Sequence, residues 1–191
     1  LNGCMEYSAV SLKGFLADEG MRDIPIGIDL NATDFGGNPP YQMRLAGLMD
    51  EEIRNEDCED AVRMYRRLLT GAGQKVEIIE IGYPQVLAGV LMSGPDDISE
   101  LCGEELFRRK VERLWVMAGK WDEEKGRENN FVRNERSRKA GHVLCEACPV
   151  PITFLGWEIG ADVITGRYLS KDDPLHMAME DHGSGQGRSS W

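Results

Sequence analysis

The sequence predicts an α/β fold in which helices flank a mostly parallel sheet. Four short runs rich in β-branched and apolar residues alternate with segments of helical pattern. These runs span residues 23–29, 76–82, 113–119 and 150–156. Three of them end at a glycine, and parallel sheets bind their ligands at the carboxyl ends of the strands. We therefore expect a site in the loops that follow Gly82, Gly119 and Gly156.

Three polar residues predict where helices begin. Asn55 precedes an acidic first turn and an apolar stripe, so it is expected to cap a helix. Asn134 is expected to cap a second helix in the same way. Asp173 followed by Pro174 is typical of an N-cap and a first helical residue, and Gly183 would end that helix. The stripe after Asn55 consists of Ala61, Val62, Tyr65, Leu68 and Leu69.

The composition is that of an ordinary globular protein. Of the 191 residues, 41% are hydrophobic and 29% charged, and we expect one domain over residues 1–191. The formal charge of -11 disfavours nonspecific binding to nucleic acid or to an anionic membrane surface, because both require a positive face. No stretch approaches the roughly 20 apolar residues that span a bilayer.

The five cysteines indicate a reducing compartment, and we expect a cytoplasmic protein. Their number is odd and their spacing uneven, which is unlike a disulfide framework. Cys145 and Cys148 have the CxxC spacing of zinc and redox sites. The sequence has no second CxxC pair, and this one ends an amphipathic segment, so a structural role is the favoured interpretation.

The loop after Gly119 carries the most informative polar pair. Glu128 and Asn130 lie two residues apart after the end of a predicted strand. A carboxylate accepts hydrogen bonds and an amide both donates and accepts, so the pair can hold vicinal hydroxyl groups. On spacing alone, a polar surface loop is the alternative.

The order of motifs in the chain resembles the calcium-dependent nucleoside hydrolases, the inosine/uridine-preferring family. That family has a strand ending in Met-Gly-Gly, then Glu-Phe-Asn, then a helix; this chain has Met-Ala-Gly at 117–119 and Glu-Asn-Asn-Phe at 128–131. The Ile-Gly-Tyr-Pro turn at 81–84 resembles the Gly-Pro-Leu-Thr turn of the family. Asp173-Pro174 falls where the family has a His-Asp-Pro helix start. The resemblance covers nearly the whole chain in the right order.

The resemblance implies a nucleoside-hydrolase-like fold and hydrolysis of the N-glycosidic bond of ribonucleosides to ribose and free base. Met117, Asp122, Glu128 and Asn130 would bind the substrate, and Asp172 takes the position of the acid that serves the leaving base. Asp173 and the backbone carbonyl of Ile81 would be ligands of a Ca2+ cofactor. The implied partner is a small nucleoside or another ribose-containing molecule, and a homo-oligomer is compatible with the sequence.

The opening aspartate cluster of the family is absent. Asp29 and Asp34 are the nearest candidates, but they lie on the wrong side of the first predicted strand and do not share its spacing. The chain opens on Leu1 and ends on Trp191, so we expect a fragment that is incomplete at its N-terminus. This chain alone would then be inactive.

Two other functions stay open. A catalytically inactive relative could retain the fold as a ribose-binding or structural module, and an aspartate cluster encoded upstream of Leu1 would argue against it. A flavodoxin-like regulatory domain fits the α/β pattern, but it requires a glycine-rich first loop that the sequence does not contain.

Overall fold

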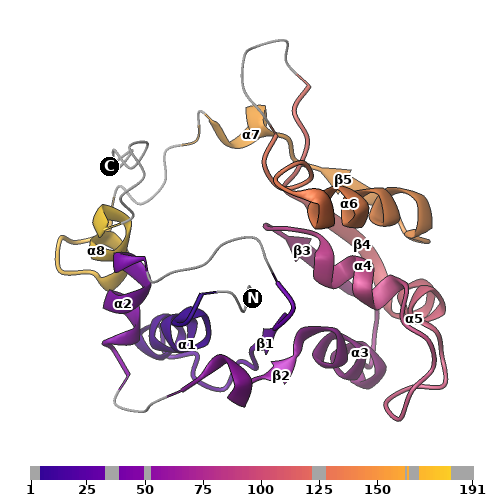
Figure 1. Ribbon diagram of the computed structural model, residues 1–191, viewed down its shortest axis with the longest axis horizontal. Coiled ribbons are helices and arrows are strands. Elements are labelled where there is room, and N and C mark those ends of the chain that lie inside the picture. Colours follow the sequence, from indigo (N-terminus) through magenta and orange to yellow (C-terminus); the bar gives the residue numbers. More distant parts are fainter. Residues whose placement is uncertain are drawn as a thin grey trace. The chain divides into compact units, whose positions relative to one another are not determined.

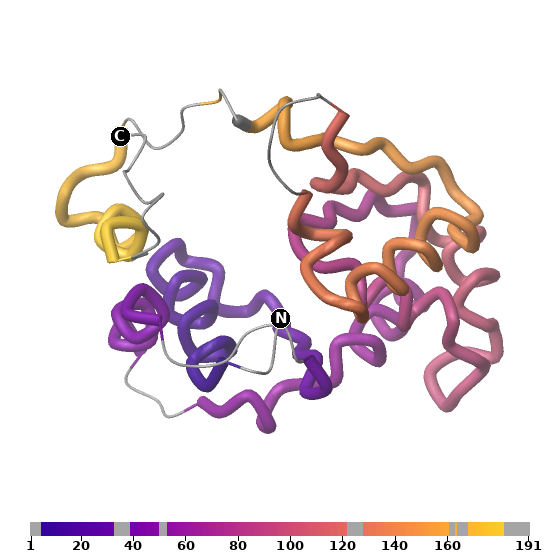
Figure 2. The backbone as a smooth tube through the Cα atoms, turned by 45° about the horizontal axis from the view of Figure 1, so that its top comes forward, coloured from indigo at the N-terminus to yellow at the C-terminus, as the bar shows by residue number. Residues whose placement is uncertain are grey.

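The computed structural model describes residues 5–32, 39–49, 53–121, 128–161, 163 and 168–181. The chain forms two compact units. Unit 1 comprises Leu1–Ala61 and Ile164–Trp191, and unit 2 comprises Val62–Val163. In Figure 2 the indigo, purple and yellow ends of the chain belong to unit 1, and the magenta to orange middle belongs to unit 2. None of the described helices is long and apolar enough to cross a membrane.

Unit 2 is built on a parallel sheet of three strands, β3 (Val76–Glu80), β4 (Val111–Val116) and β5 (Ile152–Phe154). The strand order follows the chain, and right-handed crossovers between such neighbours place their helices on one face of the sheet. α4 and α6, from different crossovers, accordingly pack together (Figure 1). The helices of this part are α3 (Ala61–Gly71), α4 (Gln85–Leu91), α5 (Gly103–Lys110), α6 (Glu135–Ala147) and α7 (Trp157–Ala161).

The core of unit 2 lies between this sheet and its helices. The register aligns Ile78 with Leu114 and Ile152, which places all three side chains on the same face. Ile78 and Leu114 are buried, and Ile152 packs against them. The helices contribute Leu69, Leu87, Val90, Leu91, Leu106, Phe107 and Leu144 to the same cluster.

Unit 1 is mainly helical. Its helices α1, α2 and α8 pack together, although α8 comes from the other end of the chain. Arg44 on α2 forms an ion pair with Asp181 at the end of α8. The elements are α1 (Ser8–Asp18), β1 (Gly27–Ile28), α2 (Pro40–Ala46), the 3-10 turn η1 (Asn55–Asp57), β2 (Glu59–Asp60) and α8 (Pro174–Asp181), with β1 and β2 paired in parallel.

The α/β class and the parallel pairing predicted from the sequence are confirmed. Each of the four apolar runs contains a strand or overlaps one, although the run over residues 23–29 gives only the two residues of β1. Asn134 caps α6 as predicted, and its Oδ1 accepts the Ser137 N–H at 2.8 Å. Asp173 caps α8 as predicted, accepting the Leu175 N–H at 2.8 Å.

The helix predicted to begin after Asn55 was placed wrongly. Residues Asn55–Asp57 form a 3-10 turn, β2 follows, and the helix begins at Ala61. The Asn55 side chain is buried and used elsewhere: its Oδ1 accepts the Ala9 N–H at 3.1 Å, and its Nδ2 donates to the Met5 carbonyl at 2.8 Å. Tertiary contacts to the beginning of α1 therefore take the amide that a helix cap would use.

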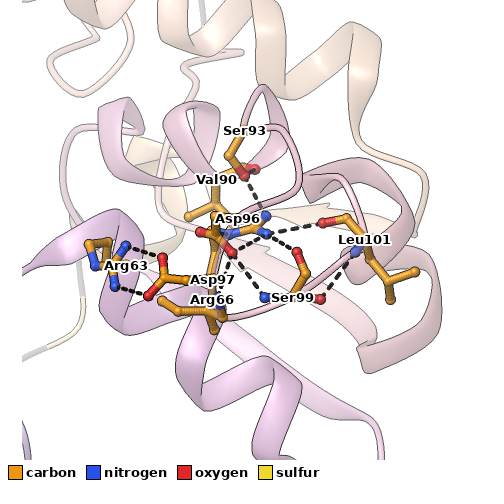
Figure 3. Close-up of polar contacts among 9 residues, drawn as sticks. Arg63, Arg66, Val90, Ser93, Asp96, Asp97, Ser99 and Leu101 are labelled. Carbon is orange, nitrogen blue, oxygen red and sulfur yellow. Dashed lines mark hydrogen bonds and ion pairs between the residues drawn. The ribbon is translucent and has the colours of Figure 1, made fainter.

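A buried arginine forms hydrogen bonds with the segment between α4 and α5 (Figure 3). Arg66 on α3 is 1% exposed, and it donates to both carboxylate oxygens of Asp96, at 2.7 and 2.9 Å. It also donates to Ser93 Oγ at 2.8 Å and to the carbonyls of Ser99 and Leu101 at 3.1 and 3.0 Å. These bonds satisfy a buried guanidinium and hold the segment in one conformation.

Candidate functional site

The carboxyl ends of β3, β4 and β5 are joined by backbone hydrogen bonds that continue past the strands. The Met117 N–H donates to the Glu80 carbonyl at 2.8 Å, and the Leu155 N–H donates to the Val116 carbonyl at 2.8 Å. Beyond them, the Trp157 N–H donates to the Gly119 carbonyl at 3.0 Å. The segments after the three strands therefore begin side by side, as the parallel sheet predicts.

Glu128 opens a turn at this edge, and the turn's own backbone surrounds its carboxylate. Oε1 accepts the Asn130 N–H at 2.8 Å, and Oε2 accepts the N–H groups of Phe131 and Val132 at 2.7 and 3.1 Å. The Gly119 N–H, from the end of β4, lies 3.4 Å from Oε1. A carboxylate has about four lone-pair positions, so these donors occupy most of its capacity.

Asn130 joins this turn to the end of β4. Its Nδ2 donates to the Met117 carbonyl at 2.7 Å, and its Oδ1 lies 3.4 Å from the Asn129 amide nitrogen. The Met117 side chain is 46% exposed. The amide therefore retains a second N–H and an accepting oxygen beside an exposed apolar side chain.

Trp121 is a further aromatic component of this edge and is not among the residues predicted from the sequence. Its ring lies directly over Gly119 and Gly156, where a Cβ on either glycine would collide with the indole. The backbone N–H of Trp121 donates to the Glu158 carboxylate, and the centroid of the indole ring lies 6.4 Å from that of the Phe154 ring. The glycines that end two of the predicted strands thus make room for the indole.

Glu80 is a second residue of this edge that is not among those predicted from the sequence. It ends β3 on the face covered by helices, and its Oε1 accepts the Gly82 N–H at 2.9 Å. Burial raises the pKa of the Glu80 carboxyl, and the Gly82 bond only partly opposes this shift. Burial, together with the Glu80 carboxylate, raises the pKa of Tyr65 to about 12. The sequence does show an acidic residue two positions after Ile78, so it lies on the same buried face of the strand, and this pattern could have indicated Glu80.

The remaining candidate residues are distributed over both units. Ile81 directly follows β3 in unit 2 and is 67% exposed. Asp173 belongs to unit 1, where its Oδ1 accepts the N–H groups at the start of α8, and its neighbour Asp172 is exposed. Asp122 lies outside the described residues. Within unit 2, the structure brings together Met117, Glu128 and Asn130.

Calcium, the metal that the resemblance implies, prefers carboxylate and carbonyl oxygens as ligands. Within the described ranges, no three His, Cys, Asp or Glu side chains are grouped so that they could hold a metal ion. Calcium takes about six to eight oxygen ligands, whereas Asp173 and the Ile81 carbonyl would supply only a few of them. Calcium binding therefore stays an expectation from the resemblance.

The arrangement at the end of β4 suits recognition of neighbouring hydroxyl groups. An amide offers one donor and one acceptor, a methionine offers an apolar surface, and a saturated carboxylate holds the turn that carries the amide. No family model, curated protein or solved structure matches the chain.

Proposed function

We propose that the turn between β4 and α6 binds the ribose of a ribonucleoside, as part of a protein that hydrolyses the N-glycosidic bond to ribose and free base. The hydrogen bond from Asn130 to the Met117 carbonyl carries this proposal, because it fixes an amide at the carboxyl end of the sheet. The order of motifs, which resembles that of the inosine/uridine-preferring nucleoside hydrolases, supports the proposal and is the reason for choosing ribose as the sugar.

The side chains of the turn have different tasks in this proposal. Asn130 pairs with the hydroxyl groups, using its second N–H as donor and Oδ1 as acceptor. Met117 contacts the apolar edge of the sugar ring. Glu128 acts as a positioning residue, because the backbone N–H groups of the turn already occupy its oxygens.

The chemical step belongs to the same proposal and rests on the resemblance alone. Water adds to C1 of the ribose while the base departs with a proton, and a carboxylic acid can supply that proton. Asp172 is the residue proposed for it. The resemblance also implies a Ca2+ ion, which would lower the pKa of a bound water.

Turnover of nucleosides tests the proposal. The chain is incubated with inosine or uridine, with calcium and with a calcium chelator, and free base is quantified by chromatography. Release of free base with an equal amount of ribose in the presence of calcium, and its loss in Asp172→Asn, would support hydrolysis, although the missing aspartate cluster predicts none from this chain alone. If no base is released and no nucleoside or ribose binds, the proposal is wrong.

The absent aspartate cluster favours a second function, in which the chain binds ribose without cleaving the glycosidic bond. The same samples distinguish the two. Binding of ribose without release of base under either calcium condition supports the binding module, and release of base supports the enzyme.

A further inference from the structure

The CxxC pair lies at the C-terminal end of α6 in unit 2, and neither cysteine belongs to the proposed ribose-binding turn. Cys145 is in the last turn of the helix, and Cys148 follows its final residue. The Cys148 N–H donates to the Leu144 carbonyl at 3.3 Å, so position 148 continues the helical spacing. Two residues at i and i+3 of an α-helix have Cα atoms about 5 Å apart, within the range that a disulfide bridges.

The two thiols differ in their surroundings. Cys145 is exposed, whereas Cys148 is partly buried and packs against the core of unit 2. The Cys148 Sγ lies 3.6 Å from the Val150 carbonyl, to which it donates. A dissolved reagent can therefore reach Cys145, and Cys148 is held where it can react next with the same sulfur.

The environment does not stabilise a thiolate at either position. Burial raises the pKa of the Cys145 thiol, and the neighbouring Glu146 raises it further. Burial also raises the pKa of Cys148; the hydrogen bond to the Val150 carbonyl opposes part of this shift, and the charge of Cys145 adds to it. Both lie at the negative end of the helix dipole, which disfavours negative charge. A dithiol of this kind reacts slowly, but its disulfide is hard to reduce, because the reduced form gains no thiolate stabilisation.

We propose that Cys145 and Cys148 are a thiol modification site that closes to an intramolecular disulfide by exchange with a low-molecular-weight disulfide such as oxidised glutathione. The Cys145 thiolate attacks the reagent, forms a mixed disulfide and releases one thiol. The Cys148 thiolate then attacks the Cys145 sulfur and releases the second thiol. The protein loses two hydrogen atoms, and the reagent gains them.

Trypsin offers a sharp test, because cleavage after Lys139 and Arg167 leaves both thiols in one peptide, residues 140–167, which contains no other cysteine. The folded chain is equilibrated with oxidised glutathione, quenched with acid, alkylated and digested. We expect this peptide to be lighter by two hydrogen atoms and to carry no alkyl group. Dithiothreitol should restore two alkylated thiols.

Single variants and the isolated cysteines provide the controls. Cys145→Ser and Cys148→Ser should each abolish the lighter peptide, and Cys148→Ser should leave a glutathione adduct on Cys145. Cys58 and Cys102 should remain open to alkylation or carry glutathione, without joining the pair. Persistent alkylation of both thiols in the native protein, or a stable glutathione adduct on its Cys145, would overturn the proposal. Both outcomes are read on the unmutated chain and are independent of any nucleoside activity.

Discussion

The Glu128 carboxylate is surrounded by the backbone N–H groups of the turn that it opens. Its position two residues before Asn130 predicts that it forms half of a hydroxyl-binding pair. The contacts give it a task that the spacing could not indicate, because spacing does not tell whether a carboxylate faces solvent or its own backbone. The Asn130 amide is therefore the better candidate for binding a ligand, and the Glu128 carboxylate stabilises the turn that carries this amide.

Removal of this carboxylate should therefore affect stability. Glu128→Ala leaves several N–H groups of the turn without their acceptor, and hydrogen bonds to a charged group are worth about 1.5–3 kcal/mol each. We expect a loss of roughly 2 kcal/mol in the free energy of unfolding, measured in urea. Glu135→Ala, which removes an exposed i,i+4 partner of Lys139, should change it little. Equal effects of the two variants would contradict this account of Glu128.

Asp96 makes stability depend on pH. The hydrogen bonds from Arg66 hold the pKa of this carboxyl well below its usual range. Because the folded pKa is depressed, the stabilisation is present above the unfolded value of about 3.9 and is lost as the pH falls through the folded value.

Asp96→Asn should thus lower stability at pH near 7 and flatten the acid side of the stability curve. Asp97→Asn is the comparison, because its bonds to Arg63 lie between exposed side chains and solvent screens them. Urea unfolding across the acid range measures both variants. An acid-side loss in Asp96→Asn as steep as in the unmutated chain, or a flatter curve in Asp97→Asn than in Asp96→Asn, would refute the assignment.

Among the elements, those with local signals could be predicted from the sequence. Asn134 and Asp173 cap helices through bonds that span only two or three residues. Asn55 has the same chemistry, but partners 46 and 50 residues away take its amide, and no local pattern reveals them. The strand runs were found because a parallel strand buried on one face retains its apolar pattern.

The candidate site likewise contains residues that local spacing predicts and residues that only the folded structure reveals. The Glu128–Asn130 turn and its place after a strand follow from spacing. Trp121 could not be found, because its ring lies on Gly156 only once β4 and β5 are in register. The sequence shows that glycines end these strands, but it does not show that an indole requires them.

Gly103, the first residue of α5, tests how closely the segment before that helix packs on α4. A Cβ at this position would collide with the Val90 carbonyl, and the Gly103 N–H donates to the Ser93 carbonyl at 2.8 Å. Gly103→Ala should destabilise the protein by about 3 kcal/mol, as overpacking of a core does. Gly94→Ala, where a Cβ meets nothing within 4 Å, should be nearly neutral. Similar melting temperatures for the two variants would exclude the close packing.

At the scale of the whole molecule, the two units differ in how the chain builds them. Unit 2 is one continuous segment, whereas unit 1 combines both ends of the chain. Its helices α1 and α2 therefore depend on α8, which follows them by more than a hundred residues. The single domain expected over residues 1–191 stays a prediction, since two compact units are compatible with one domain.

Deletion of residues 164–191 should accordingly affect one unit more than the other. Without α8, the apolar sides of α1 and α2 lose a packing partner, and Arg44 loses Asp181. We expect faster hydrogen exchange in α1 and α2 and retained protection in β4, measured by mass spectrometry. Loss of protection in β4 to the same extent would contradict a self-contained unit 2.

The proposed function depends on a ribose bound beside Asn130, and calorimetric titration with ribose and inosine measures this directly. The unmutated chain and Asn129→Ala should bind alike, because Asn129 is exposed and contributes only a long contact to the turn. Asn130→Ala should bind at least about tenfold more weakly, the loss expected for roughly 1.4 kcal/mol of hydrogen bonding. Unchanged affinity in folded Asn130→Ala, or no binding by the unmutated chain, would contradict the account.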